Sequence, residues 1–85
     1  MINKLDVNGC GITLTGARLL AEALSSNHTI RTLWLYNNPI TVEGALLIVE
    51  AAVHHTVCRQ VVIDDEYKND EIQKMMNMLE DRRRL

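Results

Sequence analysis

The stretch LWLYNNPITVEGALLIVEAA, residues 33–52, decides the fold because an earlier stretch carries the same pattern. LDVNGCGITLTGARLLAEAL, residues 5–24, aligns with it without gaps at a shift of 28 positions. The pairs that match most plainly are Thr13 and Thr41, Gly16 and Gly44, Ala17 and Ala45, and Ala23 and Ala51. Self-similarity at a fixed period of this length is the mark of a stacked repeat architecture.

Each repeat changes its hydrophobic period halfway along. Leu33 and Leu35 stand at alternate positions, which predicts a strand with one face turned inward. Further along, apolar residues recur at spacings of three and four, as in an amphipathic helix: Ala45, Ile48, Val49 and Ala52. Thr13 and Thr41 precede the two helices, where a hydroxyl oxygen can accept an unpaired amide proton. Each repeat is therefore predicted to be a strand, a tight turn and a helix.

A third strand is predicted where the 28-residue shift places Val61 and Ile63. The pattern then breaks, because Lys68 falls where both earlier repeats have isoleucine, and a charge is costly to bury. The following NDEIQKMMNMLEDRRRL, residues 69–85, has a helical apolar stripe, with acids at its start and bases at its end. This charge order suits the helix dipole. We interpret the segment as a terminal cap that is polar on its outer side.

The chain is short enough to form one domain, residues 1–85. A domain of this size buries only roughly 60–65% of the surface that its unfolded chain exposes, so its stability margin is thin. The predicted divisions are repeats at about 2–29 and 30–57, followed by a divergent third strand and capping helix at about 58–85.

The two cysteines are far apart in the chain and form no CxxC pair, which argues against a disulfide scaffold and favours a reducing compartment. Cys10 aligns with Asn38 at the turn of the repeat, so we expect it to have a structural role. Cys58 belongs to HHTVCRQVVI, which runs one residue out of phase with NHTIRTLWL. Either Val57 or Cys58 fills the position that Ile30 holds one repeat earlier.

The pattern resembles LxxLxLxx(N/C)xLxxxGxxxL, the signature of leucine-rich repeats, and its 28-residue period resembles the ribonuclease-inhibitor-type subclass. The matching residues are Ile2, Leu5, Val7, Cys10, Ile12, Gly16, Leu20, Leu24, Ile30, Leu33, Leu35, Asn38, Ile40, Gly44, Ile48 and Ala52. A finer resemblance is to the C-terminal repeats of cytosolic nucleotide-binding, leucine-rich-repeat receptors. The resemblance implies an α/β solenoid, a short right-handed horseshoe fragment with about three parallel strands on its concave face and helices on its convex face. It also implies that the chain binds other proteins.

The strand positions between the buried residues are predicted to face outward on the concave side. Parallel strands some 4.8 Å apart align these positions in three rows. The rows are Lys4, Thr32 and Gln60; Asp6, Trp34 and Val62; and Asn8, Tyr36 and Asp64. Because exposed Trp and Tyr often anchor protein interfaces, we predict that these nine residues form a partner-binding surface. The alternative is that Trp34 and Tyr36 cover the sheet, or pack on each other and on Val62.

No set of residues indicates catalysis, a cofactor or a metal site. His54 and His55 are adjacent and point to different sides of a helix, and with His28 they lack the further ligands that Zn²⁺ needs. The acidic run 64–66 lacks the glycine and the alternating oxygen ligands of a Ca²⁺ loop. There is no nucleophile, base and orienting group, and no glycine-rich phosphate loop. We therefore expect a protein that is not an enzyme.

The charge and hydropathy of the chain exclude two classes of partner. A net charge of −2 argues against nucleic acid, and the three arginines at 82–84 are interpreted as a solvated helix end. No apolar run approaches the 18 or so residues that span a membrane, and no signal peptide precedes the first strand. A soluble, cytoplasmic protein is expected.

A second function is compatible with the same pattern, namely the C-terminal end of a larger solenoid. Solenoids need about three or more repeats and polar caps at both ends, and here a cap is predicted only after Ile63. At the start, residues 1–3 lead straight into a strand, which leaves its edge and the apolar flank of the first helix uncovered. We therefore predict a homo-oligomer formed through the N-terminal edge if the chain is made alone.

Overall fold

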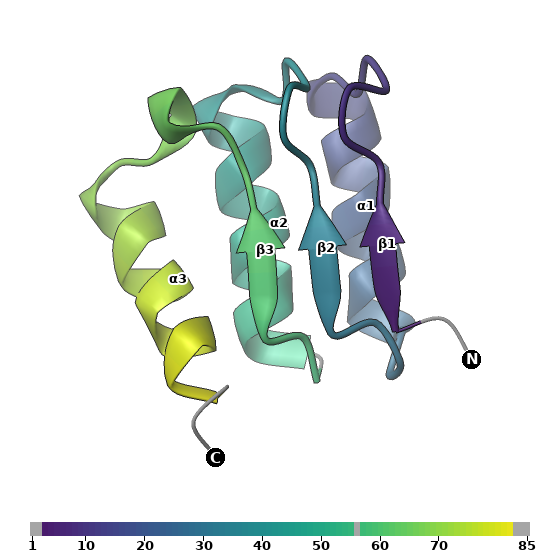
Figure 1. Ribbon diagram of the computed structural model, residues 1–85, viewed down its shortest axis with the longest axis vertical. Coiled ribbons are helices and arrows are strands. Elements are labelled where there is room, and N and C mark those ends of the chain that lie inside the picture. Colours follow the sequence, from purple (N-terminus) through teal and green to yellow (C-terminus); the bar gives the residue numbers. More distant parts are fainter. Residues whose placement is uncertain (1–2, 56, 83–85) are drawn as a thin grey trace.

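The computed structural model describes residues 3–55 and 57–82, apart from the side chain of His55 (Figure 1). Three short strands alternate with two long helices, and a third helix follows the last strand. The elements are β1 (Lys4–Asp6), α1 (Leu14–Ser26), β2 (Thr32–Trp34), α2 (Thr41–His55), β3 (Gln60–Val62), the 3-10 helix η1 (Asp65–Tyr67) and α3 (Asp70–Arg82).

The strands form one parallel sheet in the order β1-β2-β3, and α1 and α2 lie behind it (Figure 1). Leu5 pairs with Leu33, and Leu33 with Val61, so the 28-residue register of the predicted strands is confirmed. Parallel neighbours joined through a helix build the repeating βα units that were expected. The fold is thus the α/β class that the sequence predicts, a short repeating arrangement with a parallel sheet and helices on one side of it.

The hydrophobic core lies between the sheet and the helices. Its largest fully buried aliphatic residues all follow α1 in the chain: Leu33, Leu35, Ile40, Ile48, Val49, Ile63, Ile72 and Leu79. The last two belong to α3, which packs against α2 and β3 and covers the end of the core. The predicted apolar stripe of the capping helix is therefore confirmed.

Asn38 is buried in this core and ties the turns of the first two repeats together. Its Oδ1 accepts the backbone N–H groups of Cys10 (2.9 Å) and Ile12 (3.0 Å). Its Nδ2 donates to the backbone oxygens of Val7 and Leu35, both at 2.9 Å. One amide side chain thereby satisfies backbone groups in two repeats, which would otherwise lose hydrogen bonds near the core.

Only one of the two predicted threonine caps forms. Thr41 Oγ1 accepts the N–H of Gly44 at 3.3 Å, whereas Thr13, which precedes α1, makes no capping hydrogen bond with its side chain. Thr41 adopts a positive φ of 67°, a conformation that is uncommon for a β-branched residue. At α3, Asn69 Oδ1 accepts the N–H of Ile72 at 2.8 Å, so Asn69 is the N-cap.

The structure decides the position before β3 that the sequence leaves open. Cys58 is fully buried and belongs to the core, whereas Val57 is exposed. Cys58 therefore fills the position that corresponds to Ile30 in the preceding repeat.

The prediction that the basic run at 82–84 is solvated is wrong for Arg82, which is bound to the backbone of other segments. Its guanidinium donates hydrogen bonds to the backbone oxygens of Ala52 (3.0 Å) and Cys58 (3.1 Å), and to that of Val53. Ala52 and Val53 belong to the last turns of α2, where carbonyl groups lack partners within the helix. Arg82 thus joins α3 to the C-terminal end of α2. The other two arginines, at 83 and 84, lie outside the described residues.

Candidate protein-binding surface

The helices α1 and α2 cover one face of the sheet, and the other face, here called the open face, is the one on which the rows of residues are predicted (Figure 1). The register pairs them as Lys4, Thr32 and Gln60, and as Asp6, Trp34 and Val62. The third predicted row, Asn8, Tyr36 and Asp64, lies just beyond the strands, which end two residues earlier. The strands thus bring together two of the rows, and the turns that follow them carry the third.

Tyr36 is the most exposed aromatic residue of the open face, with 48% of its surface accessible. Its turn is held from both sides. The N–H of Tyr36 donates to Asn8 Oδ1 at 2.6 Å, and its carbonyl accepts the N–H of Gly9 at 2.9 Å. On the other side, the N–H of Asn37 donates to Asp64 Oδ1 at 2.9 Å. An exposed ring on a fixed backbone is pre-organised for contact.

The prediction that Asp64 faces outward is wrong, because only 9% of its surface is accessible. Its carboxylate is turned toward the neighbouring repeat, where it satisfies the amide of Asn37. Asn8 remains exposed, but its side-chain oxygen is occupied by the amide of Tyr36. Asp64 and the oxygen of Asn8 therefore position Tyr36, and they are not free for a partner.

Trp34 is half-buried, and part of its own chain covers it. The Nζ of Lys4 lies 3.7 Å from the centroid of the indole ring, within the range of a cation–π contact. The indole Nε1 is shielded from solvent and has no hydrogen-bond acceptor. Trp34 therefore shows features of both predicted alternatives, since it is on the open face and is also packed against its neighbours.

The acidic turn after β3 is engaged with its own surroundings. Lys68 Nζ pairs with Asp65 Oδ1 at 2.9 Å. Partial burial raises the pKa of the Tyr67 phenol above its ordinary value, and the negative charges of Glu66 and Asp64 raise it further. The phenol of Tyr67 consequently stays neutral to a higher pH than a free tyrosine.

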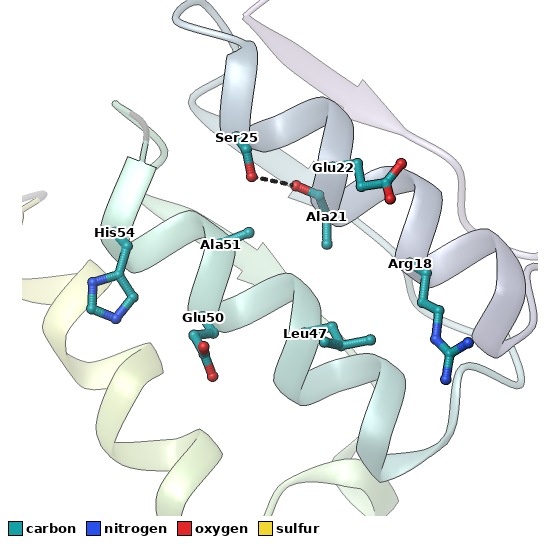
Figure 2. Close-up of a pocket in the computed structure, with 8 residues that line it drawn as sticks. All are labelled: Arg18, Ala21, Glu22, Ser25, Leu47, Glu50, Ala51 and His54. Atoms are coloured by element: carbon teal, nitrogen blue, oxygen red, sulfur yellow. Dashed lines mark hydrogen bonds between the residues drawn. The ribbon is translucent and has the colours of Figure 1, made fainter.

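A groove of about 330 Å³ lies between α1 and α2, and the sequence did not predict it. Ala21 and Ala51 line it, and small residues at facing positions are the signal that could have indicated it. Figure 2 shows that the carboxylates of Glu22 and Glu50 point away from each other, and that Arg18 stands at one end. The polar groups do not converge on a common point, so this groove is not arranged for a small ligand.

Metal binding has no support in the described part of the chain. There, no group of three or more His, Cys, Asp or Glu side chains is placed to hold an ion. The side chain of His55, one of the candidates, lies outside the described residues. Within the described ranges, neither Cys10 nor Cys58 forms a disulfide.

No described residue covers the N-terminal flank, meaning the side of β1 and α1 that faces away from β2 and α2. β1 is the edge strand of the sheet. Leu5 and Leu20 are half-buried, although their equivalents in the second repeat, Leu33 and Ile48, are fully buried. Leu19 is 62% exposed. The leucines of this flank are apolar, like the residues that are buried between the first and second repeats.

The sequence matches the family described as Leucine Rich repeat over residues 1–21 and 26–49, more than half of the chain. The chain belongs to this family. The match agrees with the repeat, the parallel sheet and the bracing asparagine described above. Leucine-rich repeats are generally protein-interaction modules.

Relatives among known proteins agree with the finer resemblance. The chain is 29% identical to mouse ribonuclease inhibitor over 84 residues, which is 98% of the chain and 18% of that protein. It is 37% identical over 54 residues to human NACHT, LRR and PYD domains-containing protein 13, covering 64% of the chain and 5% of that protein. Human NACHT, LRR and PYD domains-containing protein 5 is 45% identical over 47 residues, covering 55% of the chain and 4% of that protein. The chain thus spans less than a fifth of these relatives.

Within the described ranges, no helix combines the length and the apolar character needed to cross a membrane.

Proposed function

We propose that the chain is a non-catalytic module that binds a protein partner through the open face. The observation that carries this proposal is the exposed ring of Tyr36 on a turn held by Asn8 and Asp64. Tyr and Trp supply large contact areas, and fixing their backbone in advance lowers the entropy lost on binding. The proposed contact residues are Lys4, Asp6, Asn8, Thr32, Trp34, Tyr36, Gln60 and Val62.

The proposal requires no cofactor, metal, nucleic acid or membrane. The proposal also includes a cytoplasmic location, where the thiols of Cys10 and Cys58 would remain reduced. The net charge of −2 supports a protein partner over a polyanion.

Substitution of Tyr36 by alanine tests the proposal. Since the ring is exposed, Tyr36→Ala should leave the circular dichroism spectrum and the melting temperature nearly unchanged while weakening capture of the partner from cytosolic extract. Met78→Ala is the matched control, because Met78 is 54% exposed on α3 and does not line the pocket in which α3 borders Gln60 and Val62. Trp34→Ala, added to Tyr36→Ala, should complete the loss. Capture that survives in the double variant would overturn the proposal.

A second candidate function is the closing unit of a longer leucine-rich-repeat solenoid. The observation that favours it is the contrast between the two ends. The C-terminal end is covered by α3 and joined to α2 by Arg82, whereas the N-terminal flank leaves apolar residues uncovered. Leu19 shows this most clearly. Its equivalent, Leu47, lines the groove between α1 and α2, so Leu19 stands where a preceding repeat would pack.

Self-association of the isolated chain tests this second candidate. With no repeat to cover the flank, copies of the chain should associate through it, and the mass measured by light scattering should rise with concentration. Leu19→Glu should restore a monomer, because a carboxylate cannot be buried unpaired in such a contact. Met78→Glu places the same charge on α3, at the C-terminal end of the chain, and should leave the self-association unchanged. A monomeric mass for the unmodified chain at all concentrations would contradict this candidate.

A further inference from the structure

We propose that the open face recognises a carboxylate of its partner, held between the ammonium group of Lys4 and the indole N–H of Trp34. This inference rests on the proposed function and specifies the chemistry of the partner segment. That segment would present Asp or Glu beside apolar residues, which would contact Tyr36 and Val62.

The first supporting observation is the Trp34 donor. Its Nε1 is shielded from solvent and has no acceptor, and it is the one buried side-chain nitrogen or oxygen in the described residues with this property. Buried donors are nearly always paired, because an unpaired donor has lost its bonds to water without replacement. A ligand that supplies an acceptor would remove this deficit.

The second observation is the position of Lys4. Its Nζ lies over the indole ring at 3.7 Å from the centroid, and the side chain is exposed. In the part of the chain that the structure describes, no carboxylate lies within ion-pair distance of Lys4 Nζ. In the described residues, the ammonium group of Lys4 thus lies over the indole ring, and the N–H at the edge of the same ring has no acceptor. A carboxylate can accept from both donors at once.

The acids of the open face do not take this role themselves. Asp6 shares a row with Trp34, but its Oδ1 accepts the N–H of Asn8 at 3.1 Å. The carboxylate of Asp64 is engaged with Asn37. Lys4 is the single basic residue among the nine predicted for this face. On binding, the flexible side chain of Lys4 would move from the ring toward the partner, and the indole ring would turn so that its shielded N–H reaches the same carboxylate.

The chain contains one tryptophan, so it has a single indole N–H resonance to follow by NMR. The probes are three libraries of nine-residue peptides, with Glu, Gln or Lys at the central position and the other positions randomised. The Glu library should move the indole N–H resonance downfield, and peptides isolated from it should bind at least about tenfold more tightly than their Gln counterparts. The Lys library should not bind at the open face.

Two lysine variants test whether the preference for Glu peptides depends on Lys4. Lys4→Met keeps an aliphatic chain over the ring and removes the charge, so it should lower the affinity for Glu peptides about tenfold. Lys74→Met removes the same charge from an exposed position on α3 and should leave their affinity unchanged. If Lys4→Met disturbs the fold, as judged from the amide spectrum, the comparison of Glu with Gln peptides still decides the question.

Equal binding of Glu and Gln peptides, or a preference for Lys peptides, would overturn the carboxylate inference. In that case, sensitivity of the same binding to Tyr36→Ala would still support the open face as the binding surface. If peptides of all three libraries leave the resonances of Trp34 and Tyr36 unmoved, the carboxylate inference is wrong. The partner capture experiment would then decide the proposed function separately.

Discussion

The first and second repeats carry the same sequence pattern at a shift of 28 positions, but their equivalent residues differ in burial. Ile48 is fully buried, whereas Leu20 is half-buried; Asn38 is buried, whereas Cys10 is exposed. The second repeat lies between two neighbours, and the first has a neighbour on one side only. In a solenoid, burial therefore depends on the adjacent repeat as much as on the residue's own repeat.

The two ends of the chain extend this comparison. At the C-terminal end, Ile72 and Leu79 of α3 fill the place of a further repeat, and Arg82 binds carbonyl groups of α2. At the N-terminal end, Leu5 and Leu20 remain partly accessible. The same kind of interface is thus completed at one end and incomplete at the other.

The largest expected effect comes from shortening equivalent core residues. Ile48→Ala should lower the free energy of unfolding by about 3.5 kcal/mol, because it leaves a cavity in a fully packed site. Leu20→Ala should cost about half as much, since its site is already open to solvent on one side. Urea denaturation of both variants measures the difference. Equal losses would show that the neighbouring repeat contributes little to burial.

Substitutions of Asn38 and of its equivalent, Cys10, should differ nearly as much in their effect on the free energy of unfolding. Asn38→Ala leaves backbone groups of two repeats unpaired and should cost about 3 kcal/mol. Cys10→Ala at the equivalent position should change stability by less than about 0.5 kcal/mol, because Cys10 is exposed and its thiol makes one weak contact, with the oxygen of Asn8 at 3.6 Å. Thermal unfolding followed by circular dichroism would test this pair. A loss of stability in Cys10→Ala as large as that in Asn38→Ala would contradict the expected difference between the two repeats.

A smaller effect is expected for the arginine that closes the C-terminal end. Arg82→Met should cost about 1.5 kcal/mol, because the last carbonyl groups of α2 lose a charged donor. Arg18→Met is the matched control, since Arg18 makes only an exposed ion pair with Glu43 at 3.5 Å, and should cost under about 0.5 kcal/mol. Chemical denaturation of the two variants would sharpen the distinction between a structural and a surface arginine.

The elements and the strand register could be predicted from sequence because their signals are local and repeated. Leu33 and Leu35 define a strand by alternation, and the shift to Val61 places the third strand beside it. The capping helix was also predictable from its apolar stripe. Asp64 and Arg82 were misplaced because their roles depend on which backbone groups lie near them, and these come from other segments of the chain.

The candidate surface was predicted in part, for the same reason. Alternation places Trp34 on the open face, and the pairing with Asp6 and Val62 follows from the register. No sequence signal shows that Lys4 lies over the indole ring, or that the indole N–H lacks an acceptor. Both facts depend on side-chain rotamers chosen after the strands have paired.

The sequence by itself determined the repeat, its strand and helix periods, and the positions that can face the core. These properties follow from the geometry of a single segment, two residues per strand repeat and 3.6 per helical turn. Only the tertiary structure decided that Asn38 ties two turns together, that Cys58 and not Val57 is buried, and that Asp64 serves the adjacent repeat. Hydrogen bonds and burial are shared between segments about 28 residues apart, so they are settled when the repeats stack.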